Sequence, residues 1–172
     1  MAANKIFIFG LDRAGKTVIT NFLSKGVIDN KTKPTLAFLQ QKIILPKLNL
    51  IIFDTPGQIR FRPMWADHVK NTKVLIFVLE TSDTSRYAEA KEELTTFIKR
   101  LYFENPWMIF VFHHMDKPEA KANLEKAKAF FDIDTLYPKV HVLETSKEET
   151  TTLDKLREEI NDLIIKEIGR AH

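Results

Sequence analysis

The first residues able to do chemistry form a glycine-bounded turn near the N-terminus. Residues 10–17 read Gly-Leu-Asp-Arg-Ala-Gly-Lys-Thr and lie between an apolar run and an amphipathic stretch. This spacing is the phosphate-binding P-loop pattern, in which backbone N–H groups at the start of a helix surround an anion. We expect Lys16 to reach the β- and γ-phosphates of a nucleotide and the hydroxyl of Thr17 to bind Mg²⁺.

A second group of polar residues closes another apolar run. The run 48–53 leads into residues 54–58, which read Asp-Thr-Pro-Gly-Gln. Asp54 is placed to approach a Mg²⁺ ion, Gly57 lets a backbone N–H approach a γ-phosphate, and Gln58 can orient an attacking water. Alone, this segment fits a surface turn equally well, because proline and glycine are ordinary turn residues. Beside a P-loop, it favours nucleotide hydrolysis.

These residues need a scaffold that brings strand ends together. The alternation of strands and helices, with Pro46-Lys47 marking a hairpin, predicts an α/β fold. We expect a mostly parallel six-stranded sheet with helices on both faces and one antiparallel hairpin strand. In such sheets ligands bind at the carboxyl ends of the strands, where both motifs lie. Apolar runs predict strands at 5–9, 36–45, 48–53, 74–79, 107–112 and 139–143. The spacing of apolar residues predicts helices at 17–25, 85–102, 118–131 and 153–168, the last of which ends before Gly169.

Composition narrows the class of protein. The chain has 172 residues, of which 44% are hydrophobic and 28% charged, as is usual for one soluble domain. Lysine and arginine alternate with acidic residues and the net charge is only +3, so we expect no nucleic-acid partner. The chain has no cysteine, and Ala2 stands where myristoylation needs glycine, so no lipid anchor is expected. We therefore expect one domain over 1–172, monomeric and cytoplasmic, with only indirect membrane contact.

The motifs together resemble the Arf and Arf-like branch of the Ras-superfamily small GTPases, which are P-loop NTPases. The resemblance is most specific at 10–17 and at 57–65, where the sequence begins Gly-Gln and ends Arg-Pro-Met-Trp. It continues at 71–78 and 89–94 and covers residues 5–168. It implies a molecular switch that binds GTP or GDP with Mg²⁺, hydrolyses GTP slowly, and works with effectors, an exchange factor and a GTPase-activating protein.

The resemblance also assigns residues to the nucleotide and its metal ion. Thr17, Thr35 and Asp54 would hold Mg²⁺, with Thr35 in the first switch, at 33–35, engaged only when GTP is bound. The P-loop contacts to the nucleotide would come from Asp12, Arg13, Ala14, Gly15, Lys16, Thr17 and Val18.

The same resemblance implies how the switch works. Lys16 would neutralise charge on the phosphates, and Gln58 would position the hydrolytic water. Gly57 would sense the γ-phosphate through its backbone N–H. When that phosphate leaves, both switch loops lose their anchor and rearrange.

The base-recognition motif departs from the family pattern, which reads Asn-Lys-x-Asp; residues 113–116 read His-His-Met-Asp. Asp116 can accept two hydrogen bonds from guanine and therefore still argues for that base. His114 replaces a lysine whose stem packs on the base, and its imidazole can stack similarly. His113 replaces an asparagine that ties this loop to the P-loop, a change that bears on affinity more than on base choice. Ser146 and Lys147 lie in a loop resembling Ser-Ala-Lys, whose backbone N–H meets guanine O6.

Two local features have alternative interpretations. Phe61, Met64 and Trp65 form either an exposed effector patch or a set in which Trp65 packs under the sheet; we expect Trp65 to be partly buried and Phe61 exposed. Arg13 is expected to be solvated or to contact a phosphate, rather than to act as a built-in arginine finger.

Other functions remain open at this stage. The altered His-His pair motivates a hydrolysis-deficient guanine-nucleotide-binding scaffold. A small P-loop kinase is disfavoured because no arginine-rich lid insertion lies between the later strands. Nucleic-acid binding through surface lysines is the weakest alternative.

Overall fold

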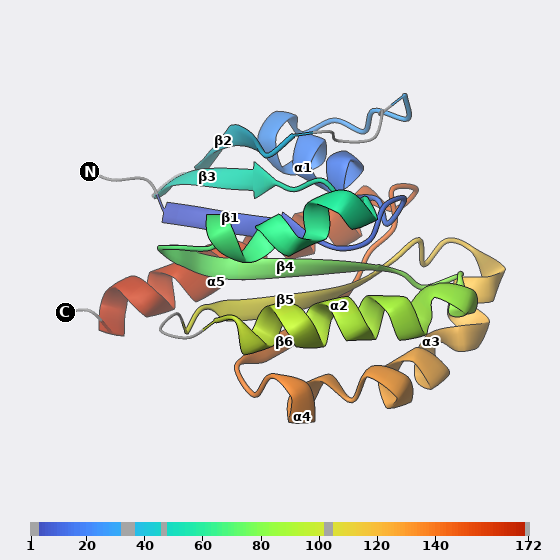
Figure 1. The fold of residues 1–172 in the computed structure, drawn as a ribbon. Helices are drawn as coiled ribbons and strands as arrows, with labels where there is room; N and C mark the ends of the chain where they lie inside the picture. The colour runs from blue at the N-terminus through green and yellow to red at the C-terminus, as the bar shows by residue number, and fades with distance from the viewer. Residues whose placement is uncertain (1–3, 32–36, 46–47, 102–104, 171–172) are drawn as a thin grey trace.

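Six strands form one sheet in the computed structural model, which describes residues 4–31, 37–45, 48–101 and 105–170 (Figure 1). The strand order is β2-β3-β1-β4-β5-β6. All neighbouring strands are parallel except β2 and β3, which pair antiparallel. The predicted sheet, mostly parallel with one antiparallel hairpin strand, is confirmed. The strands are β1 (Asn4–Phe9), β2 (Leu39–Leu45), β3 (Leu48–Asp54), β4 (Thr72–Glu80), β5 (Trp107–His113) and β6 (Val140–Glu144).

Helices cover both faces of the sheet, as predicted. Two of them pack on one face, α1 (Lys16–Lys25) and α5 (Thr150–Arg170). The other face carries the 3₁₀ helix η1 (Ile59–His68), α2 (Tyr87–Lys99), α3 (Pro118–Phe131) and the short α4 (Ile133–Leu136). A short 3₁₀ turn, η2 (Thr84–Arg86), leads into α2. Figure 1 shows α2 in front of the sheet and α5 behind it.

Alternating side chains on the central strands divide the core into two chemically different halves. In β1, Phe7 and Phe9 point to one side and Ile6 and Ile8 to the other, because successive strand residues face opposite ways. We call the half beneath η1, α2 and α3 the aromatic face; it contains Phe7, Phe9, Trp65, Phe77, Phe97, Phe110, Phe112 and Phe131. We call the half beneath α1 and α5 the aliphatic face; it contains Ile6, Ile8, Ile19, Ile52, Val74, Ile76, Ile109, Val111, Leu156 and Ile160.

The structure corrects several of the elements predicted from the sequence. The helix expected at 85–102 is a 3₁₀ turn followed by α2, which ends at Lys99. The last helix continues through Gly169 to Arg170, because one exposed glycine in a final turn costs only about 1 kcal/mol. The helices η1 and α4 were not predicted. Pro63 and a buried face that begins with the charged Arg62 hid η1, and α4 is too short for a period to show.

Within the described ranges, no helix is both long enough and apolar enough to cross a bilayer.

Candidate nucleotide-binding site

The P-loop joins the end of β1 to the start of α1, at the carboxyl edge of the sheet. Lys16 is the first residue of α1 and is only 6% exposed. Its Nζ donates a hydrogen bond to the carbonyl oxygen of Leu11 at 2.8 Å, so the ammonium group lies inside the loop. Burial lowers the pKa of Lys16 to about 8. A cation enclosed by the N–H groups of a helix start is a site for phosphate.

Gly57 lies directly on this loop. Its carbonyl oxygen accepts a hydrogen bond from the backbone N–H of Asp12 at 3.1 Å. A Cβ atom at position 57 would lie 2.5 Å from Nζ of Lys16 and 2.6 Å from the backbone nitrogen of Asp12. Because no side chain fits in that space, only glycine allows the segment after β3 to approach the loop so closely.

Two side chains with oxygen atoms that can coordinate Mg²⁺ lie close together beside the P-loop. The hydroxyl of Thr17 donates a hydrogen bond to Oδ2 of Asp54 at 3.2 Å. Asp54 ends β3 and is fully buried. A hydroxyl and a carboxylate are the hard ligands that Mg²⁺ prefers, so these residues fit that ion. The third predicted ligand, Thr35, lies outside the described residues.

Asp116 lies in the loop that connects β5 to α3. Its Oδ1 accepts a hydrogen bond from the hydroxyl of Ser146 at 2.9 Å. Burial raises the pKa of Asp116, but the Ser146 hydrogen bond, a backbone hydrogen bond and the nearby histidines together hold the pKa below its usual value. The carboxylate is therefore ionised near neutral pH and fixed in direction. Lys147, next along the chain, is half-buried.

His113 packs the base-recognition loop against the P-loop. The residue is fully buried, and its Nδ1 lies 2.7 Å from the hydroxyl oxygen of Thr145. A Cβ atom at Gly15 would overlap the imidazole, 2.7 Å from Nε2. Burial lowers the pKa of His113 to about 3, so the ring stays neutral. The imidazole therefore joins the two loops by packing, at the position where the family has an asparagine.

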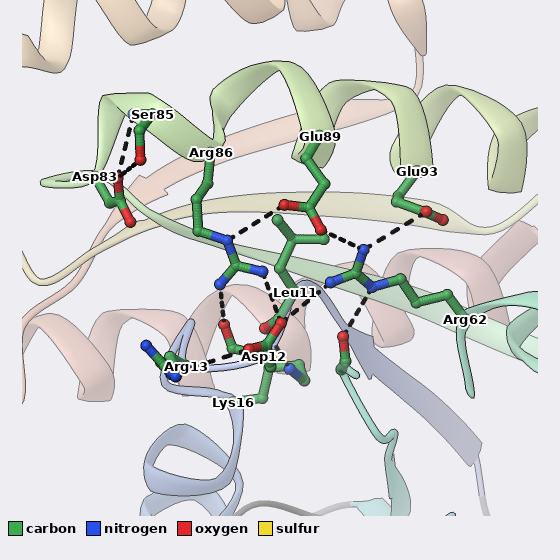
Figure 2. Close-up of polar contacts among 11 residues, drawn as sticks. Leu11, Asp12, Arg13, Lys16, Arg62, Asp83, Ser85, Arg86, Glu89 and Glu93 are labelled. Carbon is green, nitrogen blue, oxygen red and sulfur yellow. Dashed lines mark hydrogen bonds and ion pairs between the residues drawn. The ribbon is translucent and has the colours of Figure 1, made fainter. Parts of the chain in front are cut away.

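A polar network that sequence reasoning missed links the P-loop to the helices on the aromatic face (Figure 2). Arg86 donates to the backbone carbonyl of Asp12 at 2.7 Å and to its Oδ1 at 2.6 Å. Arg62, whose side chain is 1% exposed, donates to the same Oδ1 at 3.1 Å and to Glu89 at 2.6 Å. We define the polar network as Asp12, Arg62, Arg86, Glu89 and Glu93.

This network holds the segment after β3 in place. The Nε of Arg62 donates to the carbonyl oxygen of Gly57 at 2.8 Å, so a single guanidinium contacts the segment, the P-loop and α2. Burial raises the pKa of Asp12, but the hydrogen bond from Arg86, a backbone hydrogen bond and the charges of Arg86 and Arg62 together lower the pKa below its usual value. Asp12 therefore stays a carboxylate between two arginines.

The expected effector patch is smaller than the sequence suggested. Trp65 is 1% exposed, and its indole N–H donates to the carbonyl oxygen of Pro56 at 2.9 Å. The expectation of partial burial is therefore corrected, and Trp65 belongs to the aromatic face. Phe61 is half-buried rather than exposed, whereas Met64 and Ile59 are exposed.

The other residues predicted for the site differ in how far their side chains are exposed. Arg13 points into solvent, with a side chain 90% exposed, as expected for a solvated loop residue. Ala14 and Val18 have buried side chains, which leaves their backbones for any contact with phosphate. Gln58 is half-buried and directly precedes η1.

The fold and the P-loop together define a P-loop nucleotide-binding protein of the small-GTPase type. Residues 2–166 match the sequence profile of the ADP-ribosylation factor (Arf) family, so the chain belongs to the Arf family. The predicted resemblance is confirmed. The fold is similar to that of the Arl6 (BBS3) small GTPase from Trypanosoma brucei with the bound nucleotide analogue GppNp. The TM-score is 0.73 at 21% sequence identity, and the match covers 92% of this chain and 99% of that chain.

Proposed function

We propose that this chain is a GTP-binding molecular switch that hydrolyses GTP slowly with Mg²⁺ and recruits effectors in the GTP-bound state. Membership of the Arf family supports the general class. The observation that carries the proposal is that a phosphate loop and a guanine-type carboxylate share one edge of the sheet. His113 packs against Gly15 and Asp116 follows three residues later, so both ends of a nucleotide have a site.

Catalysis in this proposal is a matter of positioning and electrostatics. The buried ammonium of Lys16 stabilises negative charge on the phosphates in a site that excludes water, where charge interactions are strong. Thr17 and Asp54 would hold Mg²⁺, which would neutralise phosphate charge, and Thr35 is the proposed further ligand. Gln58 orients the attacking water from the start of η1.

Guanine selection is assigned to three residues. The ionised carboxylate of Asp116 accepts from the two adjacent donors that guanine has and adenine lacks. The imidazole of His114 stacks on the base. The loop with Ser146 and Lys147 contributes its backbone N–H groups.

The proposal includes partners. Intrinsic hydrolysis by switches of this kind is about 10⁻⁴–10⁻³ s⁻¹, so a GTPase-activating protein that supplies an arginine is expected, together with an exchange factor. A single G domain over 1–172, a monomeric state and a cytoplasmic location stay predictions from the sequence.

A hydrolysis-deficient guanine-nucleotide-binding scaffold is the second candidate. One observation favours it: the carbonyl oxygen of Gly57, rather than its N–H, is bonded to the P-loop, and the segment packs against Lys16. If that arrangement persists, a γ-phosphate has no room beside the lysine.

The test is Mg²⁺-dependent binding of GTP, GDP, ATP and XTP, followed by single-turnover GTP hydrolysis, for wild type and Gln58→Leu. Guanine-selective binding with hydrolysis lost in Gln58→Leu supports the switch. Guanine binding without hydrolysis in either protein supports the scaffold, or an enzyme that depends on its activating partner. Equal binding of ATP and GTP would contradict both.

A further inference from the structure

Glu80 ends β4 with both carboxylate oxygens engaged. Oε1 accepts hydrogen bonds from the backbone N–H of Ser82 at 3.2 Å and from its hydroxyl. Oε2 contacts Nδ1 of His114 and lies 3.6 Å from Nζ of Lys117. Burial raises the pKa of Glu80, but these partners outweigh it and lower the pKa to about 2. The side chain is 18% exposed, so a carboxylate is held in one direction at the carboxyl edge of the sheet.

The imidazole of His114 is held between this carboxylate and a second ring. The centroid of its ring lies 4.3 Å from that of His113, with an interplanar angle of 45°. The backbone of His114 has φ 62°, a conformation that few residues other than glycine adopt, and its side chain is 14% exposed. Contacts on two sides therefore fix the orientation of the His114 ring, whose backbone has an unusual conformation.

We propose that Glu80 is a positioning residue for guanine-nucleotide binding, which orients the imidazole of His114 so that it forms a rigid wall of the base site. The inference rests on the proposed function and deepens it at the same site. A lysine stem must lose rotamer freedom when it packs on a base. An imidazole already oriented by a carboxylate and a neighbouring ring loses little, so pre-organisation compensates for its smaller stacking surface.

The proposal makes the contributions of Glu80 and His114 interdependent. A carboxylate that acts by orienting a ring has nothing to orient once the ring is removed. A carboxylate that merely stabilises the end of β4 would act whether or not the ring is present. A double-mutant cycle separates the two cases.

The experiment measures release of tritiated GDP in the presence of Mg²⁺ from wild type, Glu80→Gln, His114→Ala and the double variant. Glutamine keeps the size of the side chain and an oxygen for Ser82. Glu125→Gln is the matched control, because Glu125 is a glutamate of α3 whose side chain is 88% exposed. Binding of Mg²⁺-pyrophosphate to the same proteins reports on the P-loop alone.

We expect Glu80→Gln to speed GDP release about tenfold, within the range that one stacking contact to a base contributes. In the His114→Ala background the same substitution should change release less than about twofold, and pyrophosphate affinity should stay constant throughout. Equal effects in both backgrounds, a parallel loss of pyrophosphate binding, or no effect of Glu80→Gln would each overturn the inference. Absence of GDP binding by wild type would instead overturn the proposed function, and this inference with it.

Discussion

The most informative perturbation is Lys16→Met, because the structure predicts opposite effects on stability and on binding. The Nζ of Lys16 is buried, and burial lowers the pKa of this residue from 10.5 to about 8. At about 1.4 kcal/mol for each tenfold change, the charged lysine costs the folded state about 3 kcal/mol at pH 7. The site thus holds a partly desolvated charge that a phosphate would compensate.

Methionine has a similar length and no charge, so it removes that cost. It also removes one hydrogen bond to the carbonyl of Leu11, worth about 1 kcal/mol, but that oxygen still accepts from the N–H of Ala14. The net gain is about 2 kcal/mol, which raises Tm of a protein of this size by about 4–8 °C. GDP with Mg²⁺ should stabilise the wild type by about 3 kcal/mol at a hundredfold excess over Kd and should not stabilise the variant.

The direction in which the stability difference between wild type and Lys16→Met changes with pH provides a control. The cost of the buried ammonium is fully present below pH 8 and disappears as the pH rises from about 8 to 10.5, the pKa in the unfolded chain. The cost should fall by rather more than half between pH 7 and pH 9.5, so the net advantage of Lys16→Met should shrink from about 2 kcal/mol to less than about 1 kcal/mol. The assay is thermal melting of nucleotide-free protein at both pH values, with and without GDP and Mg²⁺. The reasoning is refuted if the variant melts below wild type at pH 7, or if the difference is the same at pH 9.5.

Three further substitutions test separate parts of the site. Arg62→Met removes a buried cation from the polar network and should lower the free energy of unfolding by about 2–3 kcal/mol, measured by urea titration. The control Arg60→Met, at an exposed position, should change the free energy of unfolding by less than about 0.5 kcal/mol. Equal effects of the two substitutions would contradict a stabilising role of the polar network. Gly57→Ala adds a methyl group that would crowd the space beside Nζ of Lys16, so single-turnover GTP hydrolysis should slow at least about tenfold. An unchanged rate would mean that residue 57 moves away from Lys16 before the reaction. Asp116→Asn turns one hydrogen-bond acceptor into a donor, so the ratio of affinities for GDP and XDP, measured by competition binding, should shift toward XDP by at least about tenfold. A retained preference for GDP would show that Asp116 does not recognise the base.

The sequence alone was enough to predict those parts of the site that depend on a short stretch of neighbouring residues. Polar residues that close apolar runs lie at the carboxyl ends of parallel strands, and this rule placed Asp54 beside Thr17. The same rule applies to Glu80, which ends β4 as Asp54 ends β3.

The polar network could not be predicted in this way. Arg86 contacts Asp12 across 74 positions of the chain, and neither residue type nor spacing specifies a pair that distant. Arg62 lies in a 3₁₀ helix that contains Pro63, and a charged residue in such a segment is expected to be exposed. Charged residues are rarely buried unless paired, and such pairing becomes visible only once the fold is known.

The separation of the core into an aromatic and an aliphatic face has a spectroscopic consequence. Trp65 packs edge-on against Phe9, with ring centroids 5.4 Å apart, and the methyl groups of Leu11, Leu79 and Leu94 lie in the same cluster. Ring currents should displace the NMR resonances of those methyl groups, whereas methyl groups of the aliphatic face should keep ordinary chemical shifts except beside Phe22 and Trp107, the two aromatic residues of that cluster. Any movement of η1 carries Trp65 with it. The leucine methyl spectrum would therefore report rearrangement beside the phosphate loop without an attached probe.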